Sequence, residues 1–237
     1  MINPDTQENI IIKTGQAQEC ATKALQLCEK YSRTPNRKYL KDMGGYLGTF
    51  VNNLRSALNY AVVDYCTQRG FTKNKKGKAI STDFPYGLTE DKFKSIAIVS
   101  FMSQFDPNLY TFVEGIQPYH PKKSLLGNIM KISNMDKHQI LATVQNTDIT
   151  LFKIIDKDFF EPRHLGSAVL IGVSNGKPVL VDTPCYVPQI RMFALRNGKW
   201  LNFMIPIDDY FLEFIPFMTN AANQVVNTLN EFYGLWN

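Results

Sequence analysis

The sequence lacks most of the features that identify an enzyme class, a metal site or a membrane segment. Its four cysteines form no C-x-x-C pair and have no histidine at zinc-finger spacing, which excludes a disulfide framework and structural zinc. It has no run of 18 apolar residues and no basic start that leads into an apolar stretch, which excludes a membrane span and a signal peptide. A Walker A loop, a dinucleotide fingerprint, a G-x-S-x-G elbow and an H-E-x-x-H helix are also absent. We therefore expect a cytoplasmic protein that binds no membrane, cofactor or metal.

Apolar content and charge show what kind of chain this is. Hydrophobic residues make up 44% and charged residues 20% of the 237, which is enough apolar material for a core and excludes intrinsic disorder. The formal net charge is +5, but it is unevenly distributed: residues 1–137 hold 19 basic and 12 acidic side chains, whereas residues 138–237 hold 7 and 9. The positive first part favours an anionic partner.

Helical spacing of apolar residues dominates the first part of the chain and returns at its end. Steps of three and four residues predict helices over 17–31, 43–65, 93–104, a segment after Pro121, and 217–232. The stripe over 43–65 is the most regular, because its apolar residues fall within roughly 100° of the helix circumference. We expect Pro35, Gly70 and Pro107 to end the first three helices.

Short runs rich in β-branched and aromatic residues lie between the last two helices. They predict strands over 149–155, 167–173, 179–182, 190–195 and 200–205. Two intervening turns, 174–176 and 196–198, contain Asn-Gly, which is typical of tight hairpins. We therefore predict an α+β fold: an N-terminal helical bundle, an antiparallel sheet of four or five strands, and a C-terminal helix. We divide the chain into 1–145 and 146–237 and expect one shared core, since no linker rich in Pro, Gly or Ser separates the two parts.

Arg55 lies at the edge of the apolar stripe of the second predicted helix. Arginine keeps its charge and offers five donors, so it binds a carboxylate or phosphate, or extends its head into water. In the fourth predicted helix the periodicity points Asp136 toward the core, and a buried carboxylate needs a cation or several donors. We predict a structural ion pair between Arg55 and Asp136, beside a polar ridge of Asn52, Asn59 and Asn134.

His138 is the histidine that we consider for proton transfer. Its ordinary pKa lies near neutrality, so it suits a general base or an acid on the phosphate side. A lone helical histidine is more often solvated or hydrogen-bonded for structural reasons, and both interpretations stay open. The other two histidines, His120 and His164, lie in predicted loops and lack the spacing of metal ligands.

Residues 69–78 carry five positive charges and one aromatic side chain. Such a loop can follow a phosphate backbone, with an affinity that falls steeply as salt rises. The alternative is a solvated loop without a ligand, which is the commoner role of charge runs. The candidate nucleic-acid-binding residues are Lys73, Lys75, Lys76 and Lys78.

Four motifs resemble a family of bacterial proteins. They are LRSALNY at 54–60, Phe84-Pro85, Gln117-Pro118-Tyr119 and SNMDKH at 133–138. The family has an L-R-S-A-L-D-H helix, an F-P turn, a Q-P-Y loop and an N-I-D-K-H-R segment, and it is similar to HEPN-type helical domains. Active HEPN domains use an Arg and a His four to six residues later for metal-independent RNA cleavage, often at a dimer interface. The resemblance therefore implies RNA as a partner, a homodimer, and a setting of bacterial or phage conflict.

Two departures from this family bear on activity. Tyr60 stands where the family has its His, and Asn59 stands where it has Asp. Tyrosine, with an ordinary pKa near 10, is a poor base at neutral pH. We therefore expect a non-enzymatic HEPN-like binding module for RNA or another protein. The alternative is a metal-independent ribonuclease in which Arg55 and His138 act across a dimer.

Overall fold

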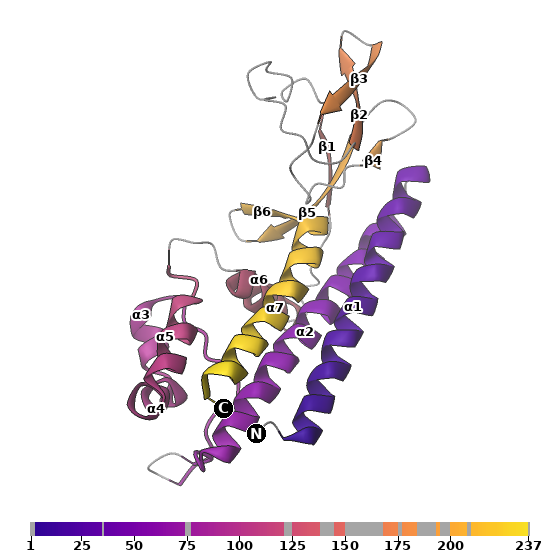
Figure 1. Ribbon diagram of the computed structural model, residues 1–237. Coiled ribbons are helices and arrows are strands. Elements are labelled where there is room, and N and C mark those ends of the chain that lie inside the picture. Colours follow the sequence, from indigo (N-terminus) through magenta and orange to yellow (C-terminus); the bar gives the residue numbers. More distant parts are fainter. Residues whose placement is uncertain are drawn as a thin grey trace.

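Long helices form the body of the molecule. The computed structural model describes residues 3–34, 36–73, 77–120, 125–137, 145–149, 168–174, 177–183, 193–194, 200–207 and 210–236. Helices α1 (Pro4–Arg33) and α2 (Arg37–Gln68) form an antiparallel pair, and α7 (Phe214–Trp236) runs beside them (Figure 1). Shorter helices pack on one side of this body: α3 (Glu90–Lys94), α4 (Ala97–Phe105), α5 (Pro107–Gly115) and α6 (Leu125–Lys137).

The starts of the two long helices follow from local chemistry. The side chain of Asn3 accepts a hydrogen bond from the backbone N–H of Asp5 at 2.9 Å, and Pro4 occupies the first turn of α1. Asn36 caps α2 in the same way, because its side chain accepts from the N–H of Lys38 at 2.8 Å. Each cap satisfies a backbone donor that has no partner within the helix.

The core lies where α2 meets α1, α6 and α7. The apolar stripe predicted over 43–65 is buried as expected, with Leu47, Leu54 and Leu58 fully inaccessible to solvent. Aromatic pairs join the two ends of α7 to α2: Phe50 contacts Phe217 with ring centroids 6.3 Å apart, and Tyr65 contacts Phe232 at 6.0 Å. Helix-on-helix packing therefore supplies most of the described core.

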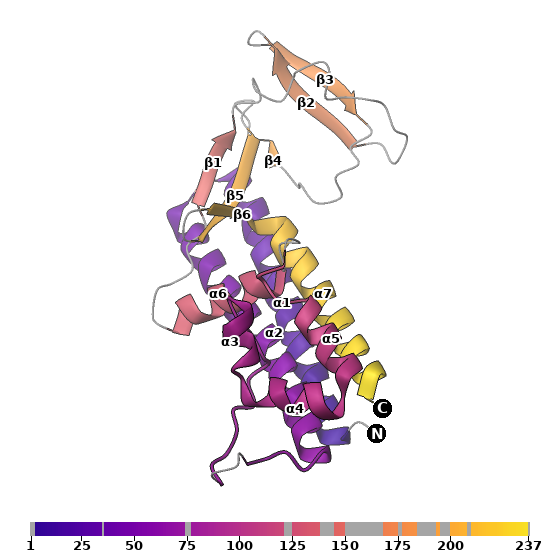
Figure 2. The ribbon, with the colours of Figure 1, turned by 90° about the vertical axis from the view of Figure 1, so that its left-hand side faces the viewer.

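Short strands lie at the end of the molecule where α7 begins (Figure 2). Their bounds are β1 Gln145–Ile149, β2 Ala168–Ser174, β3 Lys177–Thr183, β4 Phe193–Ala194, β5 Trp200–Ile207 and β6 Tyr210–Glu213. All pairings are antiparallel: β5 pairs with β1, β4 and β6, while β2 and β3 pair only with each other. The strands thus form two separate groups.

The predicted α+β fold, a helical bundle followed by an antiparallel sheet of four or five strands and a C-terminal helix, is wrong. The described chain is mostly helical, β4 has two residues, and the β2–β3 hairpin stands apart from the helices (Figures 1 and 2). Among strand residues whose side chains are described, those buried in the core are Phe203 and Ile205 of β5. The fold is therefore a helical bundle with strands appended at one end. The prediction failed because a run of β-branched residues indicates a strand but does not show whether that strand covers a core.

The helical predictions fail near residue 95 and again after residue 105. The single helix predicted over 93–104 is two helices, α3 and α4, which are broken at Ser95 and Ile96. α4 ends at Phe105, just before Pro107, as predicted. Pro107 itself lies in the first turn of α5, a helix that the sequence did not predict. None of the helices within the described residues combines the length and the apolar character that a membrane crossing needs.

Candidate functional site

Arg55 projects from α2 toward α6 and the loop that precedes α3. Its neighbours Leu54, Ala57 and Leu58 are completely buried, whereas the side chain of Arg55 is 15% exposed. The helix therefore holds a guanidinium at the margin of the core, where an arginine keeps its charge and needs acceptors.

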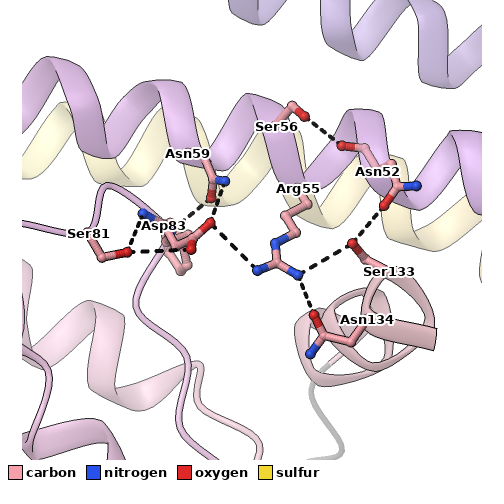
Figure 3. Close-up of polar contacts among 9 residues, drawn as sticks. Asn52, Arg55, Ser56, Asn59, Ser81, Asp83, Ser133 and Asn134 are labelled. Carbon is pink, nitrogen blue, oxygen red and sulfur yellow. Dashed lines mark hydrogen bonds and ion pairs between the residues drawn. The ribbon is translucent and has the colours of Figure 1, made fainter. Parts of the chain in front are cut away.

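Neutral side chains bind one edge of the guanidinium. Arg55 Nη1 donates to Asn134 Oδ1 of α6 at 2.6 Å and has a longer contact of 3.5 Å to Ser133 Oγ (Figure 3). Ser133 is fully buried, and its hydroxyl donates to Asn52 Oδ1 at 2.7 Å. The hydroxyl of Ser56 in turn donates to the carbonyl of Asn52 at 2.8 Å. These contacts orient the arginine but leave its charge uncompensated.

Asp83 faces the other edge, in the loop between α2 and α3. Its Oδ1 lies 3.6 Å from Arg55 Nη2, and its side chain is 55% exposed. Asn59 holds the carboxylate, because its Nδ2 donates to Asp83 Oδ1 at 2.9 Å while its Oδ1 accepts from the N–H of Phe84 at 2.8 Å (Figure 3). An exposed ion pair beyond hydrogen-bonding distance is strongly screened by water. The carboxylate therefore neutralises Arg55 only in part.

The guanidinium also retains donor capacity. Arg55 Nε is buried and finds no hydrogen-bond partner among the described residues. A buried donor without an acceptor costs about 1–3 kcal/mol, so native proteins keep few of them. The described residues therefore leave part of the hydrogen-bonding capacity of Arg55 unused.

A cleft of about 280 Å³ opens beside this arginine. Its polar wall is formed by Arg55, Ser81, Asp83 and Asn134, and its apolar wall by Phe84, Pro85, Tyr86, Ile96 and Met130. Ligand sites are usually lined by apolar side chains together with a few polar groups. The volume accommodates a phosphate or carboxylate together with part of the group that carries it.

Gln117 fixes the backbone of the segment that carries the apolar wall, at Pro85 and Gly87. This fully buried side chain accepts from the N–H of Gly87 at 3.0 Å and donates to the carbonyls of Pro85 at 3.1 Å and Val113 at 2.8 Å. Gly87 is required there, because a Cβ would lie 2.5 Å from the backbone nitrogen of Phe93. The sequence showed both motifs, Phe84-Pro85 and Gln117-Pro118-Tyr119, but gave no signal of the contact that joins them.

The same Q-P-Y loop positions α6. Pro118 lies so close to Gly127 that a Cβ on this glycine would be 2.9 Å from Pro118 Cβ. Because α6 carries Ser133 and Asn134, the loop positions the apolar wall and the polar partners of Arg55 together.

The structure brings together only some of the predicted site residues. Asn52, Asn59 and Asn134 all join the network around Arg55, directly or through one neighbour. The Asp136 side chain and all of His138 lie outside the described residues, so the Arg55–Asp136 pair stays a prediction. Asp83, which no motif singled out, is the carboxylate that the structure places beside Arg55.

The basic loop and the histidines complete the comparison with the sequence. Lys73 and Lys78 are exposed, whereas Lys75 and Lys76 lie outside the described residues, as does His164. His120 contacts Glu114 rather than solvent alone: its Nε2 lies 2.8 Å from Glu114 Oε1, which also accepts from the hydroxyl of Tyr119 at 3.1 Å. Burial and this carboxylate raise the pKa of Tyr119. The cluster links α5 to the loop after it.

The described lining of the Arg55 cleft supplies groups that can bind an anion. It offers cationic and amide donors and one carboxylate, with no histidine to move a proton near neutral pH. In the described parts of the chain, no three His, Cys, Asp or Glu side chains are grouped to hold a metal ion. Comparison of the chain with models of protein families, with curated proteins and with solved structures finds no match.

Proposed function

We propose that this protein is a non-enzymatic, HEPN-like binding module that takes a phosphate group of RNA in the cleft beside Arg55. The observation that carries the proposal is the guanidinium itself. It forms part of the cleft wall, it is oriented by neutral amide and hydroxyl groups, and its nearest described carboxylate lies 3.6 Å away and exposed. An incoming phosphate would offer the arginine shorter, charge-assisted hydrogen bonds than Asp83 does.

The charge of the chain favours RNA over a protein partner. Residues 1–137, which include Arg55 and the basic loop, carry 19 basic and 12 acidic side chains. A positive surface attracts a phosphate backbone through release of its counterions. The resemblance of the four motifs to HEPN-like domains points to the same partner, in a setting of bacterial or phage conflict. Nothing in the described geometry favours the ribonuclease alternative.

The test measures RNA binding with a charge-matched pair of variants. A fluorescein-labelled 20-nucleotide RNA is titrated with wild type, Arg55→Gln and Arg33→Gln at 50 and 200 mM NaCl, with fluorescence anisotropy as the readout. Arg33 is the matched control because it is exposed at the last turn of α1, away from the cleft. We expect Arg55→Gln to weaken binding about tenfold and Arg33→Gln to weaken it less than twofold.

Arg55→Lys separates fork geometry from charge. It keeps the cation but loses the planar fork, so we expect an affinity between those of wild type and Arg55→Gln. Melting temperatures show whether each variant is folded. Absence of RNA binding by the wild type at 50 mM NaCl, or equal effects of Arg55→Gln and Arg33→Gln, would overturn the proposal. Binding of a polyglutamate peptide in place of RNA, with the same dependence on Arg55, would assign the cleft to an acidic protein.

A further inference from the structure

Three phenylalanines form a ladder that packs against the core at one end and reaches solvent at the other. Phe101 of α4 contacts the fully buried Tyr65 of α2 with ring centroids 6.2 Å apart. Phe71, just beyond α2, stacks on Phe101 with centroids 4.1 Å apart and planes inclined by 15°. Phe105 lies on Phe101 at 4.6 Å and is 63% exposed. We call Phe71, Phe101 and Phe105 the aromatic ladder.

A salt bridge keeps the ladder in position. Asp106, directly after Phe105, accepts from Arg69 Nη2 at 2.5 Å and from the hydroxyl of Tyr65 at 2.6 Å. These contacts join the end of α4 to the end of α2, so Phe105 is presented to solvent by an ordered element. A single exposed phenylalanine is common, but one that ends an ordered stack offers a ring face at little entropic cost.

Positive charge lies next to the ladder. Residues 69–78 follow α2 directly and contain four lysines besides Arg69, whose charge Asp106 already pairs. A β-bridge between Lys73 and Ala79, with a hydrogen bond from Ile80 N–H to Thr72 O at 3.2 Å, closes the loop. The bridge places the exposed Lys73 and Lys78 at the base of the loop. Lys73 lies two residues beyond Phe71. Both ribbon views place α4 and the described residues on either side of this loop's tip at the same end of the molecule (Figures 1 and 2).

We infer that the aromatic ladder and the base of the basic loop form a stacking platform for unpaired bases of single-stranded RNA. The inference rests on the proposed RNA-binding function and specifies its substrate class. Every base has a flat face that stacks on an aromatic ring, while lysines bind the phosphates between bases, so this combination recognises single strands without sequence preference. The bases of a duplex are already stacked and paired, and its grooves give no access to such a ring.

The test compares two RNAs and two exposed apolar positions. Labelled U20 and a labelled 20-base-pair RNA duplex are titrated with wild type, Phe105→Ala, Phe105→Trp and Ile11→Ala. Ile11 of α1 is the matched control, because its exposed fraction of 62% equals that of Phe105 within one per cent. We expect Phe105→Ala to weaken U20 binding about tenfold and duplex binding less than twofold. Phe105→Trp should retain affinity, and its indole fluorescence should be quenched by U20.

The outcomes distinguish this inference from the proposed function. If the wild type binds U20 and Arg55→Gln weakens it, but Phe105→Ala binds as the wild type does, the platform is refuted and the RNA-binding function stands. Equal weakening of U20 and duplex by Phe105→Ala also refutes the platform. If the wild type binds neither RNA at 50 mM NaCl, the proposed function fails first. Loss of dimer formation in Phe105→Ala, with RNA affinity unchanged, would assign the exposed ring to a second copy of the chain.

Discussion

Replacing Gln117 with leucine should destabilise the protein, because this residue joins the apolar wall of the cleft to α5. Gln117 is completely buried and makes three hydrogen bonds, to Gly87 N–H, Pro85 C=O and Val113 C=O. Leucine has nearly the same volume but no hydrogen-bonding atom. Gln117→Leu therefore removes these bonds with little change in packing, and it leaves the buried Gly87 and Pro85 backbone groups without this partner.

The expected loss follows from these two groups. Each buried backbone group deprived of its partner costs about 2 kcal/mol, so the two together cost about 4 kcal/mol. Burial of the leucine side chain offsets about 1.5 kcal/mol of this. We therefore expect the free energy of unfolding to fall by about 2–3 kcal/mol.

Urea unfolding at 25 °C, followed by far-UV circular dichroism, measures this difference. The control is Gln18→Leu on α1, since Gln18 is exposed and its replacement should change the free energy of unfolding by less than about 0.5 kcal/mol. A loss for Gln117→Leu within about 0.5 kcal/mol of the Gln18→Leu value would refute the role assigned to Gln117.

Two further predictions concern alkaline stability and activity. Burial raises the pKa of the Cys28 and Cys66 thiols from 9.0 to about 12, so above pH 9 the unfolded chain binds fewer protons than the folded one. Stability should be constant with respect to these groups below pH 9 and lower by about 1.4 kcal/mol per thiol at pH 10. Urea midpoints at pH 8 and pH 10 measure this loss of stability. The Cys28→Ala/Cys66→Ala double variant should lose less stability between the two pH values than the wild type does. An equal loss would exclude the thiols as its cause. Incubation of the wild type with total RNA in EDTA should give no cleavage, whereas cleavage that His138→Ala abolishes at an unchanged melting temperature would establish the ribonuclease alternative.

Local periodicity located the long helices but not the start of α1, which begins at Pro4 rather than at the predicted residue 17. The stripe over 43–65 and the spacing over 217–232 correspond to α2 and α7, because residues three and four apart share a face whatever the rest of the chain does. The same reasoning placed Arg55 at the edge of that stripe, where the structure has it. It failed at α3 and α4, since the break at Ser95 and Ile96 leaves the apolar spacing on both sides nearly unchanged.

The composition of a segment did not determine its place in the fold. Runs of β-branched residues indicated strands, but β2 and β3 pair only with each other, apart from the sheet built on β5. Whether a strand covers a core depends on the partner that its face meets. That partner is set by packing between distant segments, which a strand's own sequence does not encode.

The sequence by itself determined the helical faces, the basic first half and the polar residues available around Arg55. Only the tertiary structure decided which of them meet. Asp83 lies 28 residues after Arg55 in the sequence, and Gln117 lies 30 residues after Gly87, yet each pair is in contact. Both contacts depend on how a loop returns to the bundle, and the close approach of Pro118 to Gly127 sets where α6 presents Asn134. Periodicity acts over a few residues and so predicts a face, whereas a site assembled from three segments depends on distances that only the packed chain establishes.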